Sequence, residues 1–312
     1  MMPVHHPFRI QSLPDPHSTG DKLTEDPMAN KAAQCTVTCV YETKLIGACR
    51  RVIVVWSKNL INLSLSITVN SPGNENQCTC KIDFKPWHFW SKKGLKSFEL
   101  EGKRVDVFWD LRSAKFPGGP EPSADYYVAL VSDEEVVLLL GDLKKKAYKR
   151  TKSRPSLIDA TLVYKKENIF GKKCFSTRAK FDQNNKREHD IVVENSLTGP
   201  RDPEMWISVD GIVLIHVTNL QWKFRGNETV MVNKTPVQVF WDVHDWLFGI
   251  PGSGHGMFIF RPGAPEYKPV NDGSSAGGSE TGESSNDNGY LSCESRPTTA
   301  DFSLFLYLWK IE

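Results

Sequence analysis

The chain has 312 residues, of which 39% are hydrophobic and 11% aromatic, which is enough apolar surface to form a packed core and argues against a chain disordered throughout. The formal net charge is only +2, which excludes a polycation that binds nucleic acid over its whole surface, so any basic site must be local. A chain of this length corresponds to about two average domains or one large all-β domain.

The first 30 residues are rich in proline, histidine and polar side chains, and they predict a disordered segment. They contain no apolar run that could form the core of a secretory signal, and no apolar run elsewhere has the length of a transmembrane span. We therefore expect an intracellular protein without a transmembrane segment. The cytoplasm is the first expectation, and the inner face of the plasma membrane and the nucleus are the alternatives.

Residues 31–142 predict a first unit of β-strands. Apolar and polar residues alternate in LSLSITV at 63–69 and in VDVFWD at 105–110, which is the pattern of a strand with one buried face. The run EEVVLLL at 134–140 predicts a further strand, and β-branched and aromatic residues are frequent in these runs. Short links between the runs are typical of antiparallel hairpins.

Residues 143–170 predict a basic linker between two repeats. Its first part, LKKKAYKRTKSRP at 143–155, contains seven cationic residues and no acidic residue. The cationic residues are Lys144, Lys145, Lys146, Lys149, Arg150, Lys152 and Arg154. Such a segment can bind an anionic membrane surface, act as a nuclear import signal or dock on an acidic protein, and the alternative is a solvated linker without a binding role. One interleaved tyrosine is too little aromatic surface for nucleic acid, so no sequence-specific nucleic acid is expected.

Residues 171–312 predict a second unit of β-strands. Alternation is clear in WISVDGIVLIHV at 206–217 and in VQVFWD at 237–242, and FSLFLYLWK at 302–310 predicts the last strand. The tract NDGSSAGGSETGESSNDNG at 271–289 carries too little apolar surface to fold and predicts a disordered insertion before that strand.

The two units repeat one another. Residue 237 minus residue 105 is 132, and the same offset places Trp90 on Trp222 and Gly94 on Gly226 without a gap. This match predicts an internal duplication. We therefore expect an all-β fold of two internally duplicated, largely antiparallel units with about eight strands in each half, built either as β-sandwiches or as β-barrels.

The repeated Phe-Trp-Asp is the first candidate site. Trp109 with Asp110, and Trp241 with Asp242, could form an aromatic platform and a carboxylate that face a ligand. In the structural alternative, the tryptophan fills the core at a strand end and the aspartate caps the following turn. Identical spacing in both halves favours the structural interpretation, because duplicated cores keep their packing residues.

The second copy carries further polar groups in WDVHDWLFGIPGSGHG at 241–256. Asp242, His244, Asp245, Ser253 and His255 offer the residue types of an acid–base or Ser-His-Asp site. However, GSGHG is not the G-x-S-x-G elbow, which needs a strand-to-helix turn, and the equivalent segment of the first half has no histidine. The sequence therefore predicts no catalytic residues and a protein that is not an enzyme.

Cysteines are the remaining candidates for metal ligands. Cys78 and Cys80 share one face of a strand, whereas Cys35 and Cys39 lie about 13 Å apart on an extended strand, too far to chelate one ion together. A structural zinc site needs four ligands in recognisable pairs, and no second pair is present. We expect buried free thiols, no metal and no cofactor.

Several long, tryptophan-rich blocks resemble a plant family called domain of unknown function 868. The blocks are VIVVWSKNL, KPWHFWSKKGLKSFEL, RVDVFWDLRSAKF, PEPSADYYVAL, SVDGIVLIHVTNLQWKFRGNETV and VFWDVHDWLF. The resemblance extends from about residue 30 to residue 312. It implies a plant protein, and it carries no catalytic, metal or cofactor residue over to this chain.

The sequence favours a non-enzymatic interaction or scaffold protein whose basic segment docks on an unidentified protein partner or on an anionic membrane surface. The alternative is a β-barrel that binds a small apolar, lipid-like ligand, with a lining that includes Val107, Trp109, Val239 and Trp241. The two differ in the interior, because ligand binding requires a cavity on the order of several hundred Å³, whereas a sandwich is filled by side chains.

Overall fold

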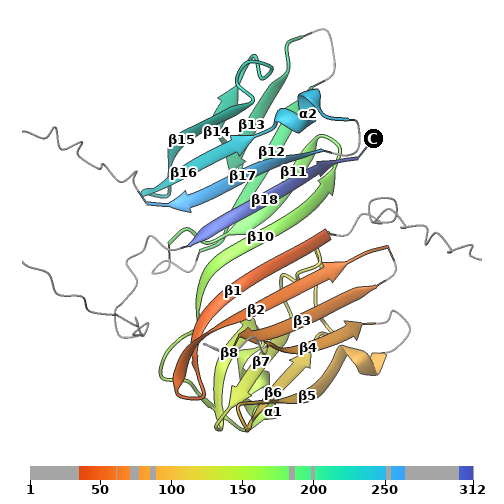
Figure 1. Ribbon diagram of the computed structural model, residues 1–312, viewed down its shortest axis with the longest axis vertical. Coiled ribbons are helices and arrows are strands. Elements are labelled where there is room, and N and C mark those ends of the chain that lie inside the picture. Colours follow the sequence, from red (N-terminus) through yellow and green to blue (C-terminus); the bar gives the residue numbers. More distant parts are fainter. Residues whose placement is uncertain are drawn as a thin grey trace, which may run out of the picture. The chain divides into compact units, whose positions relative to one another are not determined.

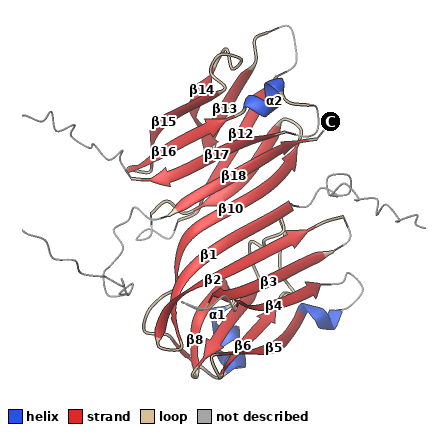
Figure 2. Ribbon diagram, in the orientation of Figure 1, coloured by secondary structure: helices blue, strands red, loops and turns tan. Residues whose placement is uncertain are grey.

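The computed structural model describes residues 35–60, 62–70, 77–84, 89–182, 187–197, 201–250, 254–263 and 302–311. The segments predicted to be disordered, 1–30 and 271–289, lie outside the described residues. Strands make up most of the described chain, and helices are few and short (Figure 2).

The first half contains nine strands among the described residues. They are β1 (Cys35–Leu45), β2 (Ala48–Lys58), β3 (Leu63–Asn70), β4 (Gln77–Phe84), β5 (Lys93–Leu100), β6 (Lys103–Asp110), β7 (Tyr127–Ser132), β8 (Glu135–Gly141) and β9 (Arg154–Pro155). A 3-10 helix, η1 (Phe89–Lys92), precedes β5, and the helix α1 (Lys144–Thr151) lies between β8 and β9.

The second half also contains nine described strands. They are β10 (Thr161–Gly171), β11 (Cys174–Ala179), β12 (His189–Ser196), β13 (Glu204–Val209), β14 (Ile212–Val217), β15 (Arg225–Val232), β16 (Thr235–Asp242), β17 (His255–Pro262) and β18 (Ser303–Lys310). The helix α2 (His244–Phe248) lies between β16 and β17.

The strands form two sandwiches that share one large sheet. In the first sandwich, β1 to β4 face a sheet ordered β5-β6-β7-β8-β9, and in the second, β11 to β14 face β15-β16-β17-β18-β10. Strand β10 pairs in parallel with β18 and antiparallel with β1, so a nine-stranded sheet runs β15-β16-β17-β18-β10-β1-β2-β3-β4 (Figure 1). The all-β prediction is confirmed, and because each sheet of the described strands ends at two edge strands, the units are sandwiches rather than closed barrels.

Both sandwiches follow the same plan. In each, a four-stranded meander faces a second four-stranded meander, and a fifth strand pairs in parallel with the last strand of the second meander. That fifth strand is β9 in the first sandwich and β10 in the second. The fifth strands differ in chain order, because β9 follows its two meanders and β10 precedes them. The match therefore covers the meanders, and the duplication itself stays a prediction from the sequence.

Residues 143–170, predicted as a basic linker, contain α1, β9 and most of β10. The strand character of β10 is hidden in the sequence, because Lys165 and Glu167 occupy positions on its inner side that other strands fill with apolar residues. The segment therefore joins the two sandwiches through hydrogen-bonded strand pairing rather than as a solvated connection.

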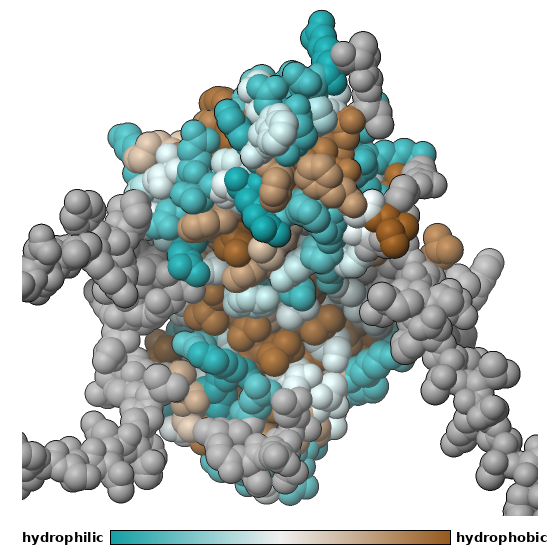
Figure 3. All heavy atoms as spheres, turned by 45° about the horizontal axis from the view of Figure 1, so that its top comes forward, coloured by the Kyte–Doolittle hydropathy of each residue, from teal (hydrophilic) through white to brown (hydrophobic). Residues whose placement is uncertain are grey.

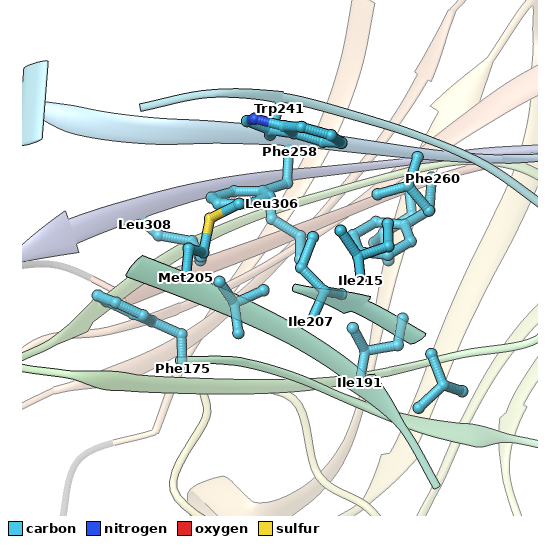
Figure 4. Packing of buried hydrophobic residues seen from close by; sticks show 14 of the residues in the cluster. Phe175, Ile191, Met205, Ile207, Ile215, Trp241, Phe258, Phe260, Leu306 and Leu308 are labelled. Atoms are coloured by element: carbon cyan, nitrogen blue, oxygen red, sulfur yellow. The ribbon is translucent and has the colours of Figure 1, made fainter. Parts of the chain in front are cut away.

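Each sandwich has its own apolar core. In the first, the alternation of β6 buries Val105, Val107 and Trp109 between the sheets, as period-two spacing predicts. In the second, Phe175, Met205 and Ile207 of the four-stranded sheet face Trp241, Phe258 and Leu306 of the large sheet (Figure 4). Burying one such large apolar side chain contributes about 1.5–3 kcal/mol, so these interiors are the main source of stability.

Candidate functional site

The repeated Phe-Trp-Asp forms a structural unit at the end of a hairpin. In the β5–β6 hairpin Trp109 lies directly opposite Gly94, and its indole Nε1 donates a hydrogen bond to the carbonyl of Ser91 over 2.9 Å. In the β15–β16 hairpin Trp241 lies opposite Gly226, and its Nε1 donates to the carbonyl of Lys223 over 3.1 Å. Each ring therefore lies over a glycine and has its polar atom satisfied within the protein.

The two aspartates close the turns that follow. A carboxylate oxygen of Asp110 accepts the Arg112 backbone N–H over 3.3 Å, and a carboxylate oxygen of Asp242 accepts the His244 backbone N–H over 3.1 Å. Asp110 also binds the Arg112 guanidinium at 2.8 Å. These contacts match the structural interpretation of the motif, in which the tryptophan fills the core and the aspartate caps a turn.

The four residues proposed as a ligand lining are packed in the cores. Val107 and Val239 are 0% and 1% exposed, and Trp109 and Trp241 are 6% and 9% exposed. Trp109 and Val107 belong to the core of the first sandwich, and Trp241 and Val239 to that of the second. They lie in two separate interiors, so they do not line one common cavity.

The polar residues of the second copy do not assemble a catalytic set among the described residues. His244 Nδ1 lies 3.2 Å from the Asp245 carboxylate at the exposed start of α2. His255 lies on β17 instead, with its ring 5.1 Å from Tyr307 and 4.7 Å from Trp309. Ser253 lies outside the described residues.

The seven predicted cations form one exposed surface on and after α1, which we call the basic surface. The inner side of α1 is anchored by Ala147, which is 0% exposed and packs on a small cluster that includes Phe108, Tyr127 and Val131 on the outer side of β6 and β7. The N–H of Arg154 donates to the carbonyl of Glu134 over 3.0 Å, which ties the following β9 to the β7–β8 hairpin. The cations are thus carried by a docked helix and a paired strand.

Most of this positive charge is unbalanced. Arg154 binds Glu135 at 2.7 Å, whereas the other six cations form no ion pair with any described residue. Lys144, Lys145 and Lys146 occupy the first turn of α1, which contains no acid, and the N-cap makes no side-chain hydrogen bond. Cations at a helix N-terminus are disfavoured by the helix dipole, typically by about 0.3–1 kcal/mol each. Helix stability therefore does not account for these lysines.

The acid nearest to the start of α1 is engaged elsewhere. The Asp142 carboxylate accepts the backbone N–H of Tyr126 over 3.1 Å. Backbone hydrogen bonds from Asp125 and Tyr126 lower the pKa of this carboxyl below its usual value. Two exposed apolar side chains follow the basic surface in the chain: Leu157 and Ile158, after β9, are 96% and 43% exposed.

Sequence reasoning missed a mostly buried ionic cluster made of Glu121, Lys165 and Glu167, whose side chains are 28%, 12% and 7% exposed. Lys165 Nζ on the inner side of β10 lies 2.8 Å from Glu167 and 3.2 Å from Glu121, which comes from the β6–β7 connection. Thr177 of β11 donates its hydroxyl to Glu167 over 2.6 Å. The charges of Lys165 and Glu167 were readable in the sequence, but nothing there indicates that Glu121 meets them.

This cluster holds the amine of Lys165 in its protonated form. Burial by itself would lower the pKa of Lys165, but Glu121 and Glu167 outweigh it and hold that pKa well above its usual value. Burial raises the pKa of the nearby Cys39 thiol far above its ordinary range, and it also raises the pKa of Tyr41. A protonated amine and a neutral thiol are poor nucleophiles, so the cluster lacks an activated group.

A family model described as plant protein of unknown function (DUF868) matches residues 32–310. The chain belongs to this family. No curated protein and no solved structure matches the chain. Membership in the DUF868 family confirms the resemblance seen in the tryptophan-rich blocks, and it assigns a plant protein without naming an activity.

Two further findings concern membrane-spanning helices and metal ligands in this DUF868 chain. In the part of the chain that the structure describes, no helix combines the length and apolarity needed to span a bilayer. Within the same residues, no three histidine, cysteine or acidic side chains gather as metal ligands would. Cys35, Cys39, Cys78 and Cys80 are free, and Cys39 and Cys80 are buried as expected, whereas Cys35 and Cys78 are only partly buried.

Proposed function

We propose that this plant protein is a non-enzymatic interaction module that docks on an anionic membrane surface through the basic surface. The observation that carries the proposal is the set of six exposed cations that form no ion pair with a described residue. Three of them, at the start of α1, do not stabilise the helix that carries them. Each cation near an anionic bilayer contributes about 1 kcal/mol, so six together provide reversible, salt-sensitive attachment.

Leu157 and Ile158 favour a bilayer over an acidic protein as the partner. Both side chains are exposed and follow Arg154 by three and four residues. Cations beside exposed aliphatic groups match the interfacial zone of a membrane, where charges meet headgroups and apolar side chains reach the acyl boundary. Docking on an acidic protein partner is the second possibility, and inside a cell either role places the protein in the cytoplasm or at the inner face of the plasma membrane.

The proposal is tested by vesicle sedimentation. The protein is mixed with phosphatidylcholine vesicles with and without phosphatidylserine, beside a variant in which Lys144, Lys145, Lys146, Lys149 and Arg150 become glutamate. The matched control reverses five exposed lysines or arginines elsewhere: Lys44, Lys172, Lys173, Lys223 and Arg261. We expect the parent and the control variant to bind only the anionic vesicles, and the basic-surface variant to lose binding by more than about tenfold.

Two results would contradict the proposal. Equal binding by the two variants would show that net charge rather than the basic surface drives attachment. Binding to soluble polyglutamate but not to anionic vesicles, abolished in the basic-surface variant, would assign the surface to an acidic protein instead. Imaging the tagged parent and the basic-surface variant in plant cells then shows whether the same residues determine subcellular localisation.

The alternative, a small apolar ligand held inside a barrel, gains no support from the described residues. The four proposed lining residues are packed in two sandwich cores. A hollow of about 440 Å³ lies on the surface, beside the end of α1, and its lining mixes charged and hydroxyl side chains such as Lys103 and Asp133 with Phe108 and Val131. It lies outside both sandwich cores, so it is not the interior cavity that this alternative requires.

A further inference from the structure

A second surface of the molecule is apolar instead of basic. It is the outer side of β16, β17 and β18, which faces away from the core of the second sandwich. Its apolar side chains, which we call the aromatic face, are all partly exposed. They are Phe240, Met257, Ile259, Phe305, Tyr307 and Trp309. Figure 3 shows hydrophobic residues exposed between hydrophilic ones on one side of the molecule.

Rings extend the aromatic face onto β10. Tyr164 lies 5.0 Å from Phe305, and Phe170 stacks on Trp309 at 5.9 Å. A soluble β-sandwich ordinarily places polar residues on the outer side of its sheets. A continuous set of rings at these alternate positions therefore marks a surface for interaction.

The equivalent surface of the first sandwich is covered by a helix. Phe108 precedes Phe240 by 132 residues, and it pairs with Ala129 as Phe240 pairs with Ile259. On this surface Phe108 is 9% exposed and Ala129 is 0% exposed, because α1 lies on them through Ala147. The chain thus shows which kind of element fits this side of its own sheet.

No described helix covers the aromatic face. The helix α2 contacts β17, but its anchor Trp246 belongs to the core between the sheets, where the ring stacks on Phe175 at 5.6 Å. Trp246 Nε1 donates to the carbonyl of Leu308 over 2.9 Å, which holds α2 at that position. The described part of the chain therefore leaves the second sandwich without a counterpart of α1 on its outer side.

The charges around the aromatic face are positive. Lys166 Nζ lies 4.4 Å above the ring of Tyr307, and Arg261 is exposed on β17. Neither forms an ion pair with a described residue. The one acid on this side of β16, Asp242, is bound to Arg225 at 2.7 Å. An occupant with acidic side chains at its edges would balance Lys166 and Arg261.

We propose that the aromatic face binds an amphipathic helix of a partner protein, with small and aliphatic residues on its apolar side and acidic residues beside them. The helix lies across β16, β17 and β18 as α1 lies on the first sandwich. Three strands span about 10 Å, which two helical turns of about 5.4 Å each cover, so roughly eight residues make the contact. This mode is helix-on-surface recognition, with successive turns supplying the apolar anchors.

The test begins with an unbiased selection. A display library of stabilised helical peptides, randomised on one side, is enriched on the full chain, and the affinities of the selected peptides are measured by fluorescence anisotropy. Binding is then compared with two variants, Phe305→Ser with Tyr307→Ser, and Lys166→Glu with Arg261→Glu. The matched control is Ile53→Ser with Val55→Ser, on the same side of the large sheet but on β2.

We expect the enriched peptides to be amphipathic and acidic. Their affinity should fall at least about tenfold in the ring variant, as for loss of an interface anchor, and less in the charge variant, and it should not change in the control. The charge variant alters one exposed and one partly exposed side chain, neither of them in a core, so it remains informative if the ring variant fails to fold. Reversal of the basic surface should leave peptide binding intact, which separates this proposal from membrane docking.

Three outcomes would overturn it. If the enriched helices bound both variants as tightly as the parent, their binding site would lie elsewhere. Concentration-dependent dimerisation of the parent in light scattering, lost in the ring variant, would make a second copy of this chain the occupant. Binding of a labelled single-stranded RNA that depends on the same rings and cations would assign the face to base stacking.

Discussion

The ring of Trp109 lies so close to Gly94 across the β5–β6 hairpin that a Cβ at residue 94 would stand 2.5 Å from the ring carbon Cζ2. The same relationship joins Trp241 to Gly226 in the second sandwich. Here glycine is required by contact rather than by backbone conformation, because the indole occupies the space of a side chain. This contact explains why the glycine and the tryptophan recur at the same spacing in both halves.

Substitution of either glycine should therefore destabilise the protein. We expect Gly94→Ala and Gly226→Ala each to lower the free energy of unfolding by about 1–3 kcal/mol, because the tryptophan must leave its rotamer or the strands must separate. Urea denaturation followed by circular dichroism measures the change. Gly119→Ala is the matched control, since a Cβ there meets nothing within 4 Å. An equal loss of unfolding free energy at all three positions would show that the contact with tryptophan is not the cause.

A second prediction concerns the β15–β16 turn, where Asn233 and Lys234 both have positive φ, of 46° and 69°. Only glycine adopts this region without cost. We expect Lys234→Gly to raise the melting temperature and to stabilise the fold by about 0.5–1 kcal/mol. Lys172→Gly, in a turn residue without positive φ, should instead destabilise. A loss of stability in Lys234→Gly would mean that the lysine side chain contributes more than the strain costs.

The buried ionic cluster provides a third prediction. Lys165→Met leaves the buried carboxylate of Glu167 and the partly exposed carboxylate of Glu121 without their cation, which should cost at most about 3–5 kcal/mol. A triple variant that adds Glu121→Gln and Glu167→Gln removes the uncompensated charges and should recover much of that loss. Thermal unfolding of the parent and both variants gives the comparison. A single variant as stable as the parent would show that the cluster is solvated.

The pH dependence of stability should show a contribution from the Asp110 carboxylate. Burial alone would raise the pKa of this carboxyl, but hydrogen bonds from Arg112 outweigh it and lower the pKa below its usual value. The unfolded chain then binds the proton more tightly than the folded one. The stabilising contribution is therefore complete above about pH 4, the ordinary value for aspartate, and is lost as the pH falls through the lower pKa of the folded state.

Asp110→Asn removes that contribution. We expect the variant to be less stable at neutral pH and to lose less stability between about pH 4 and pH 2 than the parent does. Chemical denaturation at a series of pH values measures both effects. Asp83→Asn is the control for the loss of one exposed negative charge. If the parent and Asp110→Asn lost the same free energy of unfolding as the pH falls, Asp110 would not be the group responsible.

Leu157 offers a test of membrane docking that leaves every cation in place. It is 96% exposed, so Leu157→Ser should not change stability, because the side chain makes little contact in the fold. If the residue enters the interface of a bilayer, its burial is worth about 1.5–3 kcal/mol, and vesicle affinity should fall roughly tenfold or more. Thr38→Ser, a conservative change on β1, should leave affinity unaltered. If Leu157→Ser bound vesicles as tightly as the parent, the charges alone would account for membrane attachment.

Local pattern predicted much of the structure. The alternation in VDVFWD and VQVFWD placed Trp109 and Trp241 in the cores and the aspartates at turns, because a strand exposes its two faces residue by residue. The equal spacing in the two halves indicated equal hairpins, and the pairing Gly94 with Trp109 has its match in Gly226 with Trp241. Cationic composition likewise indicated the basic surface, since solvated charge needs no partner.

The sequence by itself determined the strand type, the faces that are buried and the surface that is basic, because these depend on neighbours within a few residues. Tertiary structure alone decided the rest. Strand β10 joins β18 to β1, Glu121 meets Lys165, and α1 covers Phe108 while Phe240 stays partly exposed. Such pairings join residues far apart in the chain, and they are selected by the packing and electrostatics of whole sheets, which no local period encodes.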